Sequence, residues 1–241
     1  MNVITKAVTL AAGRGTRMGD LTEDCPKPML PLDGRPMLAH QIERLEAAGI
    51  REVLVVIGYK GYMVREYFDA HPPAVAKLSY TTQQKQDGTG SAAKLARDFS
   101  NSEPFLMVYG DNLVAPDVYR GMLEQAVAAE MVIAVKRVDD PYQGGAVYVE
   151  GDRVTRIVEK APKGSSTTNW INGGIYVFKA SIFPELDSLE VSPRGEYELT
   201  DAVHAIVNSG RFVAWRPIEG FWRDVGRPED LSSASNFVRS D

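Results

Sequence analysis

The stretch Val8–Arg17, VTLAAGRGTR, decides the fold, because a short apolar run passes there directly into a loop of small residues. The run Val8–Leu10 predicts a buried strand. The two alanines and two glycines after it let the backbone turn its N–H groups toward a ligand, which suits a polyphosphate. The loop lacks the dinucleotide fingerprint, whose third glycine would fall on Met18, and it lacks the P-loop ending. The alternative interpretation is a tight strand-to-helix turn.

Strands and helices continue to alternate through the first 135 residues. Further apolar runs predict buried strands at Val53–Ile57, Leu78–Thr82, Phe105–Tyr109 and Val132–Val135. Amphipathic stretches predict helices at Met37–Ala48, Tyr62–Ala70, Ser91–Asp98 and Pro116–Ala129. This order predicts a three-layer α/β fold with a mostly parallel central sheet, helices on both faces and a Rossmann-like first half. In such sheets, ligands bind beyond the carboxyl ends of the strands.

After about residue 140 the pattern changes, because strands follow one another without a helix between them. The predicted strands are Gly144–Val149, Val154–Glu159, Ile171–Phe178, Phe212–Pro217 and Phe221–Asp224, with a hairpin turn at Gly151–Asp152. The predicted helices are Tyr197–Asn208 and Pro228–Val238. No linker or repeat separates the halves, so we expect residues 1–241 to form a single domain that divides at about residue 135.

Composition limits the class of protein. The 241 residues include 27 Lys and Arg against 32 Asp and Glu, a net charge of −5, and 44% are hydrophobic. Such a chain can bury a full core, which excludes a disordered tail, and its single Cys25 excludes a disulfide-framed module and favours a reducing, cytoplasmic setting. No apolar run approaches the roughly 20 residues of a membrane span. The acidic balance argues against a general nucleic-acid surface, but small anionic ligands remain compatible with it.

A second notable stretch is CPKPMLPL, residues 25–32. Pro26 and Pro28 flank Lys27, fix the backbone on both sides and predict an extended segment that presents the lysine at a set angle. A lysine held in this way suits a phosphate contact. The alternative is a solvated surface lysine between loop prolines.

Together LAAGRGTR and PKPMLPL resemble the signature of the sugar-1-phosphate nucleotidylyltransferases, also called nucleotide-sugar pyrophosphorylases. The resemblance covers about residues 6–231 and implies the nucleotide-diphospho-sugar transferase fold. It implies that Arg17 and Lys27 are catalytic cations that neutralise the phosphates of a nucleoside triphosphate. It departs from many members at Gly19-Asp20, where they carry a proline. The loop residues that it assigns to the nucleotide are Leu10, Ala11, Ala12, Gly13, Gly15 and Thr16.

Polar residues also follow the third and fourth strands. In QQKQDGTG, residues 83–90, a side-chain amide can contact a base edge, although such loops are often plain connections. The resemblance assigns Gln83 to the base and places Gly88 and Thr89 beside it. In YGDN, residues 109–112, a carboxylate at the strand end suits a triphosphate only where a cation bridges them, which favours Mg²⁺; the alternative is a turn former. The resemblance assigns Gly110 to the nucleotide.

The metal ligands that the resemblance implies are Asp111 and Asp224, which more than a hundred residues separate. Asp224 lies in FWRDVGRPED, residues 221–230, and its alternative role is simply to begin a turn.

For the sugar phosphate, the second half offers a carboxylate for hydroxyl groups, a lysine for the phosphate, an amide, and glycines that leave room for the ring. The resemblance assigns these roles to Gly145, Glu159, Lys160, Asn172 and Gly174. The alternatives are an exposed charge pair and glycines at bulges or turns. The three tryptophans could wall this pocket or pack in the core, and core packing is the safer interpretation: Trp170, Trp215 and Trp222.

The expected reaction is attack by a sugar-1-phosphate oxygen on the α-phosphorus of a nucleoside triphosphate, UTP or dTTP favoured, which releases pyrophosphate and forms an NDP-sugar. The oxygen is already anionic, so catalysis is expected from positioning, charge neutralisation and Mg²⁺. The expected partners are these two substrates, without nucleic acid or membrane, and a homo-oligomer stays open. One alternative is a cytidylyltransferase acting on phosphocholine, which would call for an aromatic cage. Another is a catalytically silent regulatory module. The length leads us to expect no C-terminal β-helix.

Overall fold

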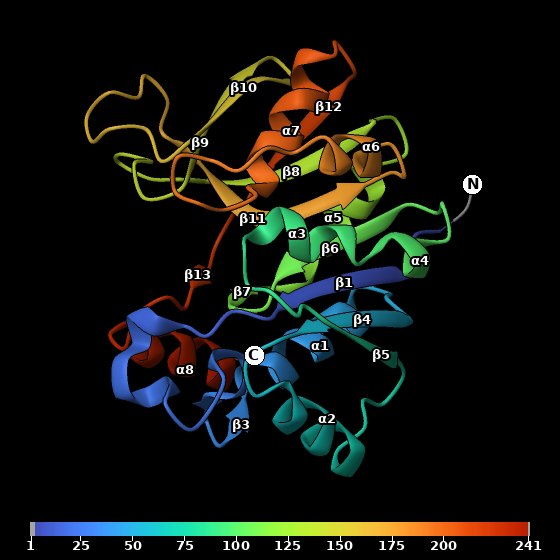
Figure 1. Cartoon of the computed structure of the whole chain (residues 1–241), viewed down its shortest axis with the longest axis vertical. Helices are drawn as coiled ribbons and strands as arrows, with labels where there is room; N and C mark the ends of the chain where they lie inside the picture. The colour runs from blue at the N-terminus through green and yellow to red at the C-terminus, as the bar shows by residue number, and fades with distance from the viewer. Residues whose placement is uncertain (1–2, 241) are drawn as a thin grey trace.

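The computed structural model describes residues 3–240, and its centre is a nine-stranded sheet in the order β5-β4-β1-β6-β11-β8-β12-β10-β9 (Figure 1). The first half contributes β1 (Lys6–Ala11), β4 (Glu52–Ile57), β5 (Lys77–Thr82), β6 (Phe105–Tyr109) and β8 (Met131–Arg137). The second half contributes β9 (Gly145–Glu150), β10 (Arg153–Glu159), β11 (Trp170–Phe178) and β12 (Val213–Pro217). Only β10 and β11 run against the other strands of this sheet, so the predicted mostly parallel sheet is confirmed.

Helices cover both faces of the sheet, and alternating strand residues supply the two cores. In β1, Ala7 packs in one core and Val8 in the other, because successive side chains of a strand point to opposite faces. The first core receives α1 (Met37–Ala47), α2 (Gly61–Ala70) and α5 (Pro116–Gln125). The second receives α3 (Thr89–Lys94), α6 (Ile182–Asp187) and α7 (Leu199–Asn208). The arrangement is the three-layer α/β fold that the sequence predicts.

Several predicted helix boundaries were wrong. The helix predicted at Ser91–Asp98 is two short helices, α3 and α4 (Arg97–Ser100), and the helix from Pro116 ends at Gln125 rather than Ala129. Tyr197 does not begin α7, because its N–H donates to Asp87 and its carbonyl accepts from Gly90, which ties it to the other loop. The last helix, α8 (Asp230–Ser240), begins two residues after the predicted Pro228, and α6 was not predicted.

A second, two-stranded sheet lies beside the main one. The strand predicted at Phe221–Asp224 is β13 (Trp222–Asp224), which pairs antiparallel with β7 (Asn112–Val114) and not with the main sheet (Figure 1). A hairpin of β2 (Pro31–Leu32) and β3 (Arg35–Pro36) and helix α8 complete this region. Its small core contains Leu32, Met37, Leu113, Val225 and Ala234. This region joins the β2–β3 hairpin to α8, which lies about 200 residues further along the chain.

Short 3₁₀ helices follow β1: η1 (Thr16–Thr22) and η2 (Lys27–Met29). The extended conformation predicted around Lys27 holds for Pro26 but is wrong for Lys27 itself, which begins η2. The N–H of Met29 donates to the Pro26 carbonyl at 2.8 Å, and that of Leu30 to the Lys27 carbonyl at 3.1 Å. These two bonds outweigh the usual preference of a residue before proline for extended backbone.

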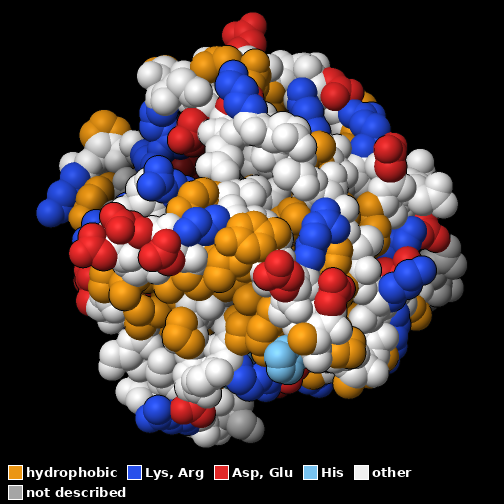
Figure 2. Space-filling view, turned by 60° about the horizontal axis from the view of Figure 1, so that its bottom comes forward, with side chains coloured by type: hydrophobic (Ala, Val, Ile, Leu, Met, Phe, Trp, Pro, Cys, Tyr) orange, Lys and Arg blue, Asp and Glu red, His pale blue; other side chains and the backbone are white. Residues whose placement is uncertain are grey.

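The surface mixes charges of both signs. Figure 2 shows lysines and arginines interspersed with acidic side chains and hydrophobic groups over one face. No helix within residues 3–240 is both long enough and apolar enough to cross a membrane.

Candidate active site

A cavity of about 780 Å³ opens where the carboxyl ends of β1, β5 and β6 meet β9–β11, β13 and the segment after β13. Every residue that the sequence analysis assigned to nucleotide, sugar phosphate or metal lines it: Leu10, Ala11, Ala12, Gly13, Gly15, Thr16, Arg17, Lys27, Gln83, Gly88, Thr89, Gly110, Asp111, Gly145, Glu159, Lys160, Asn172, Gly174 and Asp224. The structure therefore brings the whole predicted set to one cavity, and their individual roles stay predictions.

The small-residue loop packs too closely for side chains at two positions. Gly15 has φ +74°, and a Cβ there would lie 2.7 Å from the Cβ of Lys27. A Cβ on Gly110 would lie 3.0 Å from the Ala11 Cβ, and the Gly110 N–H donates to the Leu10 carbonyl at 2.9 Å. Glycine at these positions lets the loop approach both the lysine segment and the end of β6.

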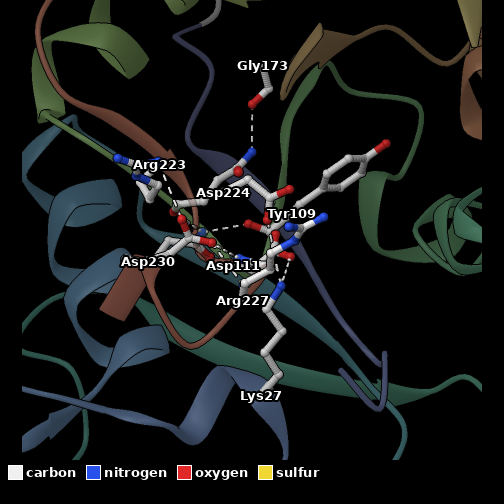
Figure 3. Close-up of polar contacts among 11 residues, drawn as sticks. Lys27, Tyr109, Asp111, Gly173, Arg223, Asp224, Arg227 and Asp230 are labelled. Carbon is white, nitrogen blue, oxygen red and sulfur yellow. Dashed lines mark hydrogen bonds and ion pairs between the residues drawn. The ribbon is translucent and has the colours of Figure 1, made fainter. Parts of the chain in front are cut away.

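Lys27, Asp111 and Asp224 meet at the floor of the cavity (Figure 3). The Lys27 ammonium contacts Asp111 Oδ2 and lies 3.7 Å from Asp224 Oδ1, and its side chain is only 9% exposed. The β7–β13 pairing explains the meeting, because it sets Asp224 opposite Asn112, and the Val225 N–H donates to the Asp111 carbonyl at 3.0 Å. The small sheet therefore joins two carboxylates that lie far apart in the chain.

The two carboxylates have opposite pKa shifts. Burial would raise the pKa of Asp111, but the Lys27 ammonium outweighs burial and holds that pKa below its usual range. The charge of Asp111, and then burial, raise the pKa of Asp224 to about 7, against the opposing effect of Lys27 and Arg17. The Lys27 ammonium thus does not fully compensate these two carboxylates, whose side chains are 23% and 44% exposed, and the pair favours a further cation.

The oxygen atoms that remain are suited to a divalent cation. Asp111 Oδ1 and Asp224 Oδ1 are buried and have no hydrogen-bond partner within the described chain. No group of three or more His, Cys, Asp and Glu side chains in residues 3–240 could hold a metal ion. Mg²⁺ commonly binds to one or two carboxylates and completes its coordination with water and substrate phosphates, so the donor set fits it.

A buried glutamine that the sequence analysis did not single out holds this edge in place. Gln41, on α1, donates through Nε2 to the carbonyls of Tyr109 and Asn112, both at 2.8 Å. Asn112 in turn donates through Nδ2 to the Gly173 carbonyl at 2.6 Å. The only signal in the sequence was one polar residue among the apolar positions of α1. Gln41 therefore positions the residues on both sides of Asp111.

On the base side, side-chain amides join the loops. Gln83 donates through Nε2 to the Gly88 carbonyl at 3.0 Å, and Gln86, which was not predicted, donates to the Ala12 carbonyl at 3.0 Å. The hydroxyl of Thr89 accepts from the Leu199 N–H at 3.1 Å. Thr89 thus supports the start of α7 as well as lining the cavity.

On the opposite side, Gly145, Glu159 and Asn172 form a polar corner. A Cβ on Gly145 would lie 3.3 Å from the Asn172 Cβ and 3.4 Å from Glu159 Oε2. Asn172 accepts from the Gly174 N–H at 3.0 Å and donates to the Tyr176 hydroxyl at 2.5 Å. Lys160 is exposed beside this corner, with φ +43°.

Arg194, which was not assigned a role, lines the same corner. Its Nη2 lies 2.5 Å from Glu198 Oε1 and 3.7 Å from Glu159 Oε1. Burial raises the pKa of Glu159, while Thr200 and Arg194 act in the opposite direction. The loop that carries Arg194 has no helix or strand pattern, so the sequence analysis had no basis for assigning this arginine a role.

The tryptophans divide between core and cavity. Trp170 and Trp215 pack against each other with ring centroids 5.3 Å apart and do not line this cavity; both are half-buried and pack against the second core. Trp222 lines the cavity and donates through Nε1 to the Gly173 carbonyl at 3.1 Å.

The fold is that of the nucleotide-diphospho-sugar transferases. A solved UDP-glucose pyrophosphorylase, complexed with UDP-glucose, superposes on 98% of this chain and 99% of its own, with a TM-score of 0.87 and 24% identity. The chain belongs to the Nucleotidyl transferase family, whose sequence profile matches residues 6–241.

Two curated relatives agree with this assignment. The bifunctional protein GlmU of Methanococcus maripaludis strain C5 is 36% identical over 231 residues, which are 95% of this chain and 53% of that protein. The chain thus spans about half the length of that relative. The UTP–glucose-1-phosphate uridylyltransferase AglF of Haloferax volcanii is 32% identical over 240 residues, which are 98% of this chain and 97% of AglF.

Proposed function

We propose that this protein transfers a nucleotidyl group from a nucleoside triphosphate, UTP or dTTP favoured, to a sugar-1-phosphate, with release of pyrophosphate and formation of an NDP-sugar. The observation that carries the proposal is the meeting of Lys27, Asp111 and Asp224 between the small-residue loop and the corner formed by Glu159 and Asn172. The name of AglF, which aligns over almost its whole length, supports a sugar-1-phosphate as acceptor.

In this mechanism the phosphate oxygen of the sugar-1-phosphate attacks the α-phosphorus, and the bond to the leaving pyrophosphate breaks. The attacking oxygen is anionic at neutral pH, so no residue has to remove a proton. Arg17 and Lys27 neutralise the charge that develops on the phosphates, while the backbone of the small-residue loop orients them. Bound by Asp111 and Asp224, Mg²⁺ would supply Lewis-acid polarisation of the phosphate oxygens.

The remaining residues set the orientation of the two substrates. Gln83 contacts the base beside Gly88 and Thr89, and Gly110 keeps the floor of the site open. Glu159 accepts from sugar hydroxyls and Asn172 donates to one, while Lys160 attracts the sugar phosphate. Gly145 and Gly174 border the space proposed for the ring, and packing itself requires glycine at Gly174, where a Cβ would clash with Asn112 Nδ2.

A pyrophosphate-release assay tests the proposal directly. The assay crosses UTP, dTTP, CTP, GTP and ATP with several sugar-1-phosphates and with phosphocholine, each with and without Mg²⁺. We expect release with UTP or dTTP and a hexose-1-phosphate or N-acetylhexosamine-1-phosphate, and loss of release when the metal is chelated. Turnover of CTP with phosphocholine would instead identify the cytidylyltransferase alternative, and no release with any pair would favour the silent module.

Two substitutions then test the site. Asp111→Asn and Lys27→Ala are each expected to lower kcat by at least about 10²–10³-fold, because the first removes a charged ligand of the metal and the second removes a cation from the reacting phosphates. Lys163→Ala, which changes an exposed lysine outside the cavity, is the matched control. Turnover close to wild type in either site variant, with the control unchanged, would contradict the assignment.

We also propose that residues 1–241 act as one unit, which the continuous nine-stranded sheet supports. A cytoplasmic setting and a homo-oligomer stay predictions from the sequence.

A further inference from the structure

The segment between β4 and α2, residues 58–60, packs against the start of the small-residue loop, although no role was assigned to it. A Cβ on Gly58 would lie 2.5 Å from the Ala12 carbonyl oxygen, so glycine is needed for this approach. The next N–H, that of Tyr59, donates to the same carbonyl at 3.2 Å. The ring of Tyr59 also lies beneath Arg14, whose guanidinium carbon is 5.2 Å from the ring centroid and whose side chain lines the cavity.

The same segment holds the far end of η1. The hydroxyl of Tyr59 and the ammonium of Lys60 both donate to the Glu23 carbonyl, each at 2.6 Å. The ammonium also lies 3.2 Å from Asp24 Oδ1, but that carboxylate is fully exposed, so the ion pair adds little. Two adjacent residues thus contact residues 12–24 at the beginning and at the end.

Lys60 makes these contacts from a strained backbone. Its φ is +47°, in the left-handed region that glycine adopts without cost and lysine does not. Glycines stand nearby at Gly58 and Gly61, but the left-handed position itself is occupied by lysine. Such an outlier points to a use for the side chain that offsets the strain.

We propose that Tyr59 and Lys60 are positioning residues that hold residues 12–24 in the conformation that binds the triphosphate. The proposal rests on the function proposed above. A segment ordered in advance does not have to be ordered by the nucleotide, so the anchor raises affinity for the triphosphate without touching it. Arg14, supported on the Tyr59 ring, is then presented to the cavity as a further cation for the phosphates.

Two variants separate this role from simple stabilisation. Tyr59→Phe keeps the ring under Arg14 and removes only the hydroxyl donor. Lys60→Gly removes the ammonium and relieves the backbone strain, so a merely structural role predicts an unchanged or higher Tm and unchanged nucleotide binding. Lys60→Arg keeps a cationic donor and is expected to retain most of the affinity. Tyr62→Phe, at a tyrosine of α2 that is 57% exposed, is the matched control.

The first measurement is amide hydrogen exchange of residues 12–24 without nucleotide. Tyr59→Phe and Lys60→Gly are expected to exchange at least about 3-fold faster than wild type and Tyr62→Phe. The second is the affinity for UTP and dTTP with Mg²⁺, by titration calorimetry, together with KM for each substrate. We expect nucleotide affinity to weaken about 3- to 10-fold for each variant, the range of one lost hydrogen bond, with KM for the sugar-1-phosphate unchanged.

Exchange that matches wild type in both variants would overturn the anchor. Faster exchange with unchanged nucleotide affinity would overturn the positioning role. A rise in KM for the sugar-1-phosphate as large as that for the nucleotide would also overturn it. If wild-type protein binds none of UTP, dTTP, CTP, GTP and ATP in the same titration, the proposed function itself fails. If wild type binds UTP or dTTP and both variants bind it equally well, only the anchor fails.

Discussion

The absence of a side chain at Gly15 allows Lys27 to reach the floor of the cavity. Its stem packs against Gly15, where a methyl group would lie 2.7 Å from the Lys27 Cβ and where φ is +74°. Gly13, two residues earlier, has open space around it and no such φ. The two glycines of the loop therefore have different requirements, although they look equivalent in the sequence.

We predict that Gly15→Ala lowers the free energy of unfolding by about 1–3 kcal/mol, since it adds backbone strain and a clash at once. It also displaces Lys27, so kcat is expected to fall at least about 10-fold. Urea unfolding and steady-state kinetics measure the two effects. Gly13→Ala is the control for stability and is expected to unfold as wild type does; equal losses of stability in both variants would contradict the argument.

Glu159 is expected to help bind the sugar-1-phosphate and, at the same time, to lower the stability of the folded protein. Burial raises its pKa in the folded protein, whereas in the unfolded chain it loses its proton near the ordinary value of about 4.3. The folded state therefore binds the proton more tightly, and the free energy of unfolding falls as pH rises from that value through the folded pKa. Above the folded pKa the whole cost of the buried charge is present.

We predict that Glu159→Gln raises Tm at neutral pH by about 1–4 °C while KM for the sugar-1-phosphate rises about 10-fold. Thermal unfolding followed from acid to neutral pH checks the first effect, because the gain should shrink toward acid pH. The exposed Glu150→Gln is the control. A lower Tm for Glu159→Gln at neutral pH would show that its contact with Arg194 outweighs the cost of burial.

At the scale of elements, the pairing of β7 with β13 builds the floor of the site. This small sheet depends on a helix from the first half, since Gln41 on α1 donates to the carbonyls on both sides of Asp111. A substitution at Gln41 on α1 is therefore expected to displace Asp111 and, through the β7–β13 pairing, Asp224.

We predict that Gln41→Leu lowers the free energy of unfolding by about 1–3 kcal/mol or more, because it leaves two buried carbonyls without a donor. The kcat should fall as well, since Asp111 loses its fixed position. Gln125→Leu is a matched control: Gln125 donates to the Trp215 carbonyl at 3.1 Å, away from the cavity. The control should lose some stability and keep its turnover, and equal kcat losses would argue against a local effect.

The same scale shows what the sequence could predict. Continuous apolar runs predicted β4 and β6, because strands covered by helices on both faces bury the side chains of both faces. Glycine and proline motifs predicted the small-residue loop and Lys27 as parts of one site. The pairing of β7 with β13 could not be predicted, because it depends on contacts between distant segments of only three residues each. The 3₁₀ turn at Lys27 was not predicted, because the residue before a proline usually has extended backbone. Two backbone hydrogen bonds, from the Met29 and Leu30 N–H groups, stabilise the turn instead.

The roles of polar side chains could not be predicted from pattern either. Gln41 and Arg194 acquire their roles only from neighbours that the fold brings to them. Asp111 and Asp224 were found through the resemblance, and their distance along the chain gave no indication that they meet. Pattern thus predicted most of the longer elements and the resemblance assigned much of the cavity lining, whereas the contacts that hold the site in place needed the structure.

At the scale of the whole molecule, the order of strands joins the two halves. β11, from the second half, lies between β6 and β8 of the first half and pairs antiparallel with both. Without β11, these two strands would each present an unpaired edge, and such edges pair readily with other chains.

We predict that a fragment ending at residue 140 aggregates or stays unfolded, while the full chain unfolds in urea in a single transition. Size-exclusion chromatography and circular dichroism of the fragment, beside the full chain, test this. Adding residues 141–180 should be necessary for soluble fragments. A monomeric fragment 1–140 with a cooperative transition would contradict both this prediction and the proposal of a single unit.

The position of β11 in the chain also determines when β6 and β8 can complete their pairing during protein synthesis. β8 ends at residue 137 and β11 at residue 178, so at typical synthesis speeds about 2–8 s pass between the emergence of these two ends from the ribosome. During that interval β6 and β8 of the nascent chain each have an unpaired edge. We expect this period to be when the growing polypeptide most needs a chaperone, and slow codons between these two points would lengthen it.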